Sequence, residues 1–297
     1  MTTEIFEAHR PLLTGVAHRV LGDRAEAEDV VQEAWLRWRS VDHTSVDDPR
    51  AYLVTTASRL AVDRARSARA RRESYVGEWL PEPAAPEAAA EQRAETADSV
   101  GYALLVLLQT LSPLERAVFV LREAFAFPYT EVAEVIGRSE AAARQLARRA
   151  REHVREQSPR FSPDRASHRR ITERFLTASL EGDLDGLTEL LTEDASFVAD
   201  SGGRTKAPLH ALHGRTSVTR FLTAIAAHPE RFLESTGLPG DAPFGFATTD
   251  SGGTPVTVMH AAGQALALFA VEVDGGRIRR VLMVSNPDKL TRVPVPG

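Results

Sequence analysis

The side chains between Glu140 and Arg155 have the types and spacing needed to read duplex DNA. Five Arg stand against one Glu from residue 141 to residue 155. Arg and Gln can make bidentate hydrogen bonds to base edges, and further Arg side chains can hold phosphates. We therefore expect this segment to lie in a DNA groove.

Two short helices joined by a three-residue turn would position these side chains. Gly137 can adopt the left-handed conformation that ends a helix. Ser139 is a good N-cap for the second helix, and Glu140 suits its positive end. A tight turn with Gly, followed by an Arg-rich helix, is typical of a helix-turn-helix over residues 129–154. A solvated helical hairpin is the alternative for such a segment in isolation.

A second concentration of positive charge lies on a helix expected over residues 50–72. It carries six Arg from Arg59 to Arg72, and only Asp63 opposes them. Tyr52 stands near its start. Arg beside an aromatic side chain suits single-stranded nucleic acid, in which bases stack and phosphates need countercharge. Core packing is the alternative for Tyr52.

The composition is that of an ordinary water-soluble, multidomain protein. The 297 residues are 43% hydrophobic and 26% charged, with a net charge of −5. No apolar run approaches the ~20 residues that span a bilayer, so we expect a cytoplasmic location and no membrane partner. The absence of Cys excludes disulfides and thiolate metal sites.

The segments DRAEAEDVVQEAWLRW (23–38) and DPRAYLVTTASRLAVDRARSARARR (48–72) resemble region 2 of a bacterial sigma factor. The helix-turn-helix resembles region 4. Their order and spacing are similar to the two-domain extracytoplasmic-function type, which lacks region 3. The resemblance implies a transcription initiation factor, not an enzyme, that binds core RNA polymerase and promoter DNA as duplex and as melted single strand. It implies no cofactor and no catalytic or metal site.

The resemblance also assigns roles to individual residues. The expected core-polymerase contacts are Asp29, Gln32, Glu33 and Arg37; the minus-10 contacts are Tyr52, Arg59, Arg64 and Arg66; and the minus-35 contacts are Glu140, Arg144, Gln145 and Arg148.

A linker is expected over residues 76–100, where six acidic residues and one Arg accompany several Pro and Ala. Within it, Trp79 and Leu80 are apolar side chains that should dock rather than stay in water.

The remaining 139 residues predict a domain of another kind. Helical patterns come first, and alternating apolar segments follow at 255–260, 265–273 and 277–284, with a hairpin turn at 274–276. This order favours an α+β cone and resembles SnoaL-like domains of the polyketide-cyclase superfamily. The expected fold is thus multidomain: two all-α domains, then an α+β SnoaL-like cone. The expected boundaries are 1–75 for region 2, 76–100 for the linker, 101–158 for region 4 and 159–297 for the cone.

Three short motifs are similar to those of sigma factors fused to such a domain. They are WLPEP (79–83), NPDKL (286–290) and DSGGR (200–204), the last departing from a DGGGK-like turn at Ser201 and Arg204. We expect them to meet at one interface, with Trp79 as its buried anchor. The expected members are Trp79, Leu80, Pro81, Asp200, Gly202, Gly203, Asn286, Pro287, Asp288 and Lys289. The resemblance implies that the domain modulates activity in cis and that no separate anti-sigma factor is required.

The sequence leaves other functions of the C-terminal domain open. Cones of this type often enclose a pocket, so a small-molecule ligand is one alternative. Acid–base catalysis is another, with the candidates Asp200, His210, His213, Asp250 and His260. For the whole chain, the alternative is a ligand-binding or cyclase-type SnoaL-like enzyme that carries an N-terminal DNA-targeting module.

Overall fold

The computed structural model describes residues 2–72, 74–83, 101–158, 164–251 and 254–295. They form two compact units, each with its own hydrophobic cluster. The first unit holds described residues 2–72, 74 and 104–158; the second holds 75–83, 101–103 and the described residues from 164 onward. No helix in these ranges is long and apolar enough to cross a membrane.

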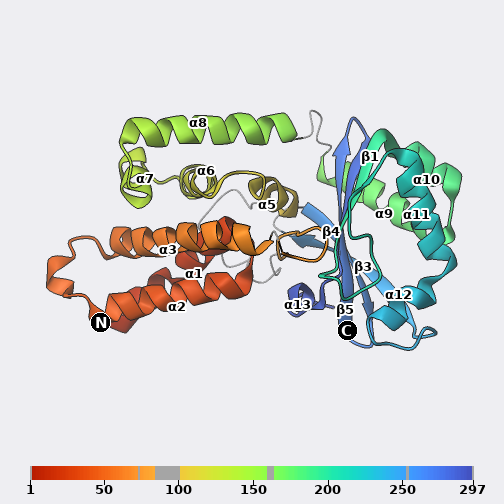
Figure 1. Ribbon diagram of the computed structural model, residues 1–297, viewed down its shortest axis with the longest axis horizontal. Coiled ribbons are helices and arrows are strands. Elements are labelled where there is room, and N and C mark those ends of the chain that lie inside the picture. Colours follow the sequence, from red (N-terminus) through yellow and green to blue (C-terminus); the bar gives the residue numbers. More distant parts are fainter. Residues whose placement is uncertain (1, 73, 84–100, 159–163, 252–253, 296–297) are drawn as a thin grey trace. The chain divides into compact units, whose positions relative to one another are not determined.

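The regular elements of the first unit are helical throughout its described part (Figure 1). The helices are α1 (Thr2–Leu21), α2 (Arg24–Ser40), α3 (Pro49–Arg72), α5 (Tyr102–Leu108), α6 (Pro113–Phe119), α7 (Tyr129–Ile136) and α8 (Glu140–Gln157), with a 3-10 turn η1 (His43–Ser45) and a π-helical turn η2 (Val120–Ala124). The first two residues of α5 belong to the second unit.

Local capping signals set the ends of the key helices. Gly137 ends α7 in the left-handed conformation, with φ of 63°. Ser139 then opens α8, because its side chain accepts a hydrogen bond from the Ala142 amide at 3.3 Å. The predicted helix-turn-helix turn is confirmed. At the start of α6, Ser112 and Glu115 form a capping box.

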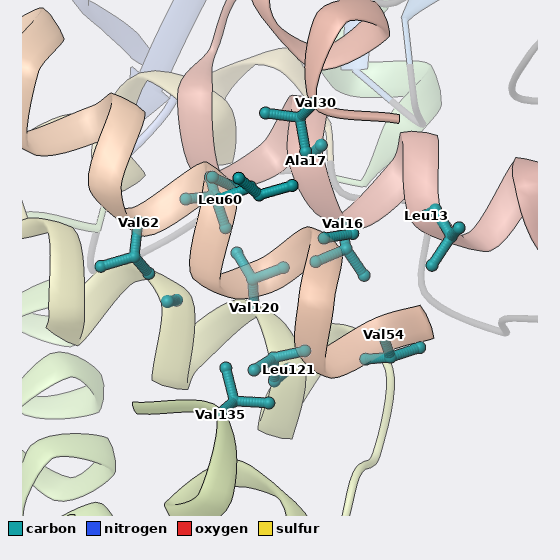
Figure 2. Packing of buried hydrophobic residues seen from close by; sticks show 14 of the residues in the cluster. Leu13, Val16, Ala17, Val30, Val54, Leu60, Val62, Val120, Leu121 and Val135 are labelled. Atoms are coloured by element: carbon teal, nitrogen blue, oxygen red, sulfur yellow. The ribbon is translucent and has the colours of Figure 1, made fainter. Parts of the chain in front are cut away.

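The two helical modules of the first unit share one core. Figure 2 shows Leu13, Val16, Val30, Val54 and Leu60 from α1–α3 in the same cluster as Val120, Leu121 and Val135. Arg116 of α6 is 4% exposed, and its guanidinium donates to the carbonyl of Val20, at the end of α1, at 2.8 Å. A buried cation near the carboxyl end of a helix is favourable. The modules therefore form a single packed body.

The second unit packs four of its helices on one face of a six-stranded sheet, whereas its last, short helix lies on the other side (Figure 1). The helices are α9 (Arg165–Glu181), α10 (Leu184–Leu190), α11 (Arg215–Ala227), α12 (Pro229–Ser235) and α13 (Pro287–Leu290), and the strands are β1 (Leu191–Asp200), β2 (Leu212–His213), β3 (Phe244–Ser251), β4 (Thr254–Ala261), β5 (Gln264–Asp274) and β6 (Arg277–Val284). The strand order is β2-β1-β6-β5-β4-β3, with β1 and β6 parallel and the other pairs antiparallel. The predicted helical domains followed by an α+β cone are confirmed.

The predicted hairpin between β5 and β6 is confirmed. Gly275 and Gly276 have φ of 57° and 80°, as a two-residue type I′ turn requires. Strand β3, at the edge of the sheet, was not predicted from the sequence. Most of its side chains are half-buried, so they show no alternation of apolar and polar residues.

We expect Leu121→Ala to lower the free energy of unfolding of the helical unit by about 2–5 kcal/mol, because Leu121 is fully buried in the shared core. Since both modules use this core, α1–α3 and α6–α8 should lose stability together. Hydrogen exchange of their backbone amides, measured at increasing urea concentration, reports the stability of each module. Leu36→Ala is the matched control. Leu36 is 55% exposed, so its loss should change stability by no more than about 0.5 kcal/mol. Selective destabilisation of α6–α8 alone would contradict the shared core.

Candidate functional site

Asp200, at the end of β1, is the centre of a buried polar site in the second unit. Its side chain is 0% exposed. One carboxylate oxygen accepts from the Tyr75 hydroxyl at 2.6 Å and the Gly202 amide at 3.2 Å. The other accepts from the Lys289 ammonium at 2.6 Å and the Leu80 amide at 2.8 Å. A buried carboxylate needs such partners, so Asp200 holds the linker directly.

Lys289 of α13 holds the same linker residue from its other side. It is 7% exposed, and its ammonium donates to the Leu80 carbonyl at 2.6 Å. The ammonium also lies 4.1 Å from the centre of the Trp79 ring, a cation–π distance. The amide and the carbonyl of Leu80 are thus both bound by buried charges. We call Asp200, Lys289 and the Leu80 backbone the linker lock.

Asn286 joins the lock to the start of α13. Its side-chain oxygen accepts from the Asp288 amide at 3.1 Å and so caps the helix. Its amide nitrogen donates to the Tyr75 hydroxyl at 2.8 Å. The turn before the helix therefore contacts the same tyrosine as Asp200 does.

Gly202 and Gly203 are required by backbone conformation and by close approach. Their φ angles are 57° and 72°, in the left-handed region. A Cβ on Gly202 would lie 2.7 Å from the Asn286 amide nitrogen, and one on Gly203 would lie 2.8 Å from a methyl carbon of Val76. These glycines let the turn reach the linker.

Two tyrosines that the sequence reading missed complete the site. The Tyr102 hydroxyl is fully buried and donates to the Pro81 carbonyl at 3.1 Å. Burial raises the pKa of Tyr102, and the charge of Asp200 raises it further. Burial and the hydrogen bond to Asp200 likewise raise the pKa of Tyr75. Both remain neutral donors at physiological pH. Their position on either side of WLPEP is the signal that could have identified them.

The structure brings the three predicted motifs together but corrects one role. Trp79 is only partly buried, whereas Leu80 is 4% exposed. Trp79 covers the Lys289 ammonium with one face, which leaves part of the ring at the surface. Pro287 starts α13, and Asp288 forms an exposed ion pair with Arg204 at 3.1 Å.

The residues expected to contact polymerase lie along α2. Gln32 is exposed, and Leu36 gives the same helix an exposed apolar side chain. Arg37 pairs with Glu33 at 2.7 Å, and Arg64 of α3 pairs with Asp29 at 3.0 Å. Arg64, expected at the minus-10 element, is thus tied to the α2 face.

The other residues expected at the minus-10 element are spaced seven residues apart on α3, and each has a different partner. Tyr52 packs against Trp38 with ring centres 5.7 Å apart. Arg66 is exposed and pairs with Asp63. The Arg59 guanidinium donates to the carbonyls of Glu134 at 2.6 Å and Val135 at 3.2 Å, so it binds the end of α7.

The residues expected at the minus-35 element lie in the first three turns of α8. Arg144, Gln145 and Arg148 are exposed. Arg144 is oriented by an ion pair with Glu140 and by the Tyr129 ring, 4.5 Å away. Arg148 pairs with Glu152 one turn later. The surface combines charge with oriented side chains, as a DNA-reading helix requires.

The acid–base candidates do not assemble into a catalytic site. Asp200 belongs to the lock, and Asp250 lies 3.8 Å from Arg165. Among the described residues, no group of three or more His, Asp or Glu side chains could hold a metal ion. The second unit also contains an apolar cavity between its sheet and helices α9, α11 and α12, and His210, His213 and His260 are not among the residues that line it.

Comparison with known proteins assigns the class. Sigma-70 region 2 matches residues 5–71, and sigma-70 region 4 matches residues 102–154. The two helical modules are therefore those of a sigma-70 factor, a transcription initiation factor rather than an enzyme. The alternative of a cyclase-type enzyme is set aside.

The chain belongs to the extracytoplasmic-function (ECF) RNA polymerase sigma factors. It is 40% identical to the ECF RNA polymerase sigma factor SigJ of Mycobacterium tuberculosis, over 99% of this chain and 95% of SigJ. The crystal structure of SigJ is similar with a TM-score of 0.72 and 34% identity, over 99% of this chain and 100% of that one. A probable ECF sigma factor SigI of the same organism is 40% identical over 63% of this chain and 65% of its own length.

We expect Lys289→Met to lower the free energy of unfolding of the second unit by about 3–5 kcal/mol, because Asp200 would stay buried without its countercharge. Glu78 and Glu82 lie in the held segment, so a Glu-specific protease should cleave there faster in the variant. Arg204→Met is the control; its pair with Asp288 is exposed, and its loss should cost at most about 1 kcal/mol. Equal protease rates in both variants would show that the lock does not hold the linker.

Proposed function

We propose that the chain binds core RNA polymerase through α2, reads the minus-10 element with α3 and the minus-35 element with α8, and is modulated in cis by its C-terminal unit. The observation that supports the modulation is the linker lock, which binds Leu80, in the chain between regions 2 and 4, to the C-terminal unit. Run-off transcription from a library of upstream DNA fragments, with core polymerase added, tests the basic activity. Failure of the full-length protein to direct any specific start site would overturn it.

The exposed face of α8 supports the minus-35 assignment. Arg144 and Gln145 are adjacent residues near the amino end of the helix. In helix-turn-helix proteins, this end of the recognition helix contacts base edges in the major groove. The other Arg residues continue along α8 and suit phosphates. The α2 face supports a protein partner, since it mixes paired charges with the exposed Leu36.

Occupying both promoter elements requires the two helical modules to separate. Elements at minus-10 and minus-35 are about 25 base pairs apart, or roughly 85 Å of duplex. A packed body of about 130 residues has a radius of gyration of only about 14 Å. We infer that the shared core opens when the chain engages polymerase and DNA, and that Arg59 must then leave the carbonyls of Glu134 and Val135.

The C-terminal unit can oppose this opening through the linker. Tyr75, just after region 2, is bound by Asp200 and Asn286. Tyr102, at the start of region 4, is bound to Pro81 of the same linker. With both points held in the C-terminal unit, the distance between region 2 and region 4 along the linker cannot increase. Release of the linker lengthens the tether and favours the open form.

Substitution of Arg144 or Gln145 by Ala should weaken binding to a selected promoter fragment by about 5- to 150-fold, the value of one bidentate base contact. Arg277→Ala removes an exposed Arg from the C-terminal unit and serves as the charge-matched control for Arg144→Ala. Fluorescence anisotropy with duplex DNA gives the dissociation constants. If the α8 variants bind as tightly as the control variant, α8 is not the reading helix.

Opening can be measured directly because the natural chain has no Cys. Dyes on Ser40→Cys and Arg138→Cys, both exposed, report the separation of the helical modules by energy transfer. We expect transfer to fall when core polymerase binds, and to fall at a lower polymerase concentration when Lys289→Met is added. A pair at Arg10→Cys and Ser40→Cys, both within region 2, should not change.

An unchanged signal from the Ser40–Arg138 pair in a transcribing complex would exclude opening. A fall in transfer that is the same with and without Lys289→Met would instead exclude control by the linker lock.

A further inference from the structure

The second unit contains an apolar cavity of about 160 Å³ between the sheet and helices α9, α11 and α12. Fourteen of its fifteen lining residues are apolar, and six of them are Phe. The aromatic part of the lining is Phe175, Phe197, Phe232, Phe244, Phe246 and Phe269. This concentration is high for a chain that has only 12 Phe in 297 residues.

The cavity has an apolar opening. Leu180 and Phe244 belong to its lining and are 48% and 36% exposed. They are two of the few large apolar side chains that the described part of the chain leaves in water. Apolar side chains at the mouth of an apolar cavity favour entry of an apolar molecule.

The fifteenth lining residue, Ser179 of α9, is polar. Its hydroxyl oxygen is buried and has no hydrogen-bond partner among the described residues. Thr172, two turns earlier on α9, instead donates to the backbone carbonyl of His168 at 2.9 Å. A buried hydroxyl without a partner is unfavourable, and a ligand hydroxyl or carbonyl would satisfy it.

From this lining we propose that the cavity is a binding site for a small neutral aromatic molecule with one hydroxyl or carbonyl group. The volume fits a single substituted ring, because a cavity of about 150 Å³ lined by Leu, Ile and Phe binds benzene. Phe rings can pack edge-to-face against such a ring. No charged side chain lines the cavity in the described residues, so an ionised ligand would be excluded.

The cavity is connected to the linker lock through two paired strands. Phe197 of β1 and Met283 of β6 line the cavity. Asp200 and Asn286 each follow three residues later, and β1 and β6 are hydrogen-bonded in parallel register up to the pair Asp200–Val284. A ring that packs against Phe197 and Met283 therefore stabilises the strand ends that hold the linker. This regulatory part rests on the proposed function, whereas binding itself does not.

Binding is tested with p-cresol and toluene, which differ by one hydroxyl. The full-length chain should bind p-cresol with a dissociation constant of ~1 mM or tighter in calorimetry and should melt at a higher temperature in its presence. Ala226→Phe fills the cavity from α11 and should weaken both ligands at least about tenfold. Ser179→Ala should weaken p-cresol about fivefold and leave toluene unchanged.

These variants also separate a lost site from a lost fold. If Ala226→Phe no longer melts cooperatively, the conservative Ser179→Ala comparison still decides the assignment. Absence of saturable binding of both compounds to the natural chain, or equal loss of both on Ser179→Ala, would overturn it. Binding of 4-methylbenzoate as tight as that of p-cresol would do so as well.

Coupling is tested by hydrogen exchange at the Leu80 amide, which donates to Asp200. With p-cresol at ten times its dissociation constant, this amide should exchange up to about tenfold more slowly, and the effect should vanish in Ala226→Phe. Saturating p-cresol that leaves Leu80 exchange unchanged would overturn the regulatory part. No polymerase is present in these measurements, so their outcome is independent of the proposed promoter activity.

Discussion

The buried pair of Asp200 and Lys289 is the interaction on which the C-terminal unit and the linker both depend. With exposures of 0% and 7%, neither charge is solvated, so each needs protein partners. Leu80 supplies one partner to each of them, its amide to the carboxylate and its carbonyl to the ammonium. Without the linker, both charges would lose a hydrogen bond at a site from which water is largely excluded. The described linker residues 76–83 are thus a structural component of the C-terminal unit and not a passive tether.

Recognition of backbone atoms explains which departures from the family pattern this site tolerates. Ser201 replaces a glycine but has no left-handed φ, and its hydroxyl accepts from the Gly203 amide at 3.2 Å. Arg204 replaces a lysine, and its charge pairs with Asp288 at the surface, away from the buried pair. Gly202 and Gly203 have no such freedom, because both positive φ and contact with the linker exclude a side chain. The site therefore constrains the backbone conformation of the turn more strongly than it constrains the side chains at positions 201 and 204.

Local signals made much of this structure predictable, and long-range packing accounts for what was missed. The turn at Gly137, the capping box at Ser112 and the hairpin at Gly275 follow from conformational preferences within a few residues. The motifs also identified Asp200 and Lys289, but not that they pair, since 89 residues separate them. Tyr75 meets Asn286 across 211 residues, which no local pattern encodes. Trp79 was predicted to be the buried anchor. Instead Leu80 is the more deeply buried residue, because its backbone amide and carbonyl are hydrogen-bonded to Asp200 and Lys289.

The interactions of the linker lock are of a kind that allows a small ligand to shift the equilibrium between docked and released linker. A ligand changes a two-state equilibrium only by the difference between its affinities for the two states. A single-ring ligand with a dissociation constant near ~1 mM has about 4 kcal/mol of binding free energy in total. The free-energy difference between the docked and the released state of the linker must therefore be smaller than about 4 kcal/mol for such a ligand to shift the equilibrium. A large apolar interface would readily exceed it. In a buried ion pair the cost of desolvation largely offsets the Coulomb attraction, so the net stabilisation is small although the loss of one partner is severe. A buried ion pair that binds one peptide group can thus be specific in geometry, while its net stabilisation stays small enough for the linker to be released.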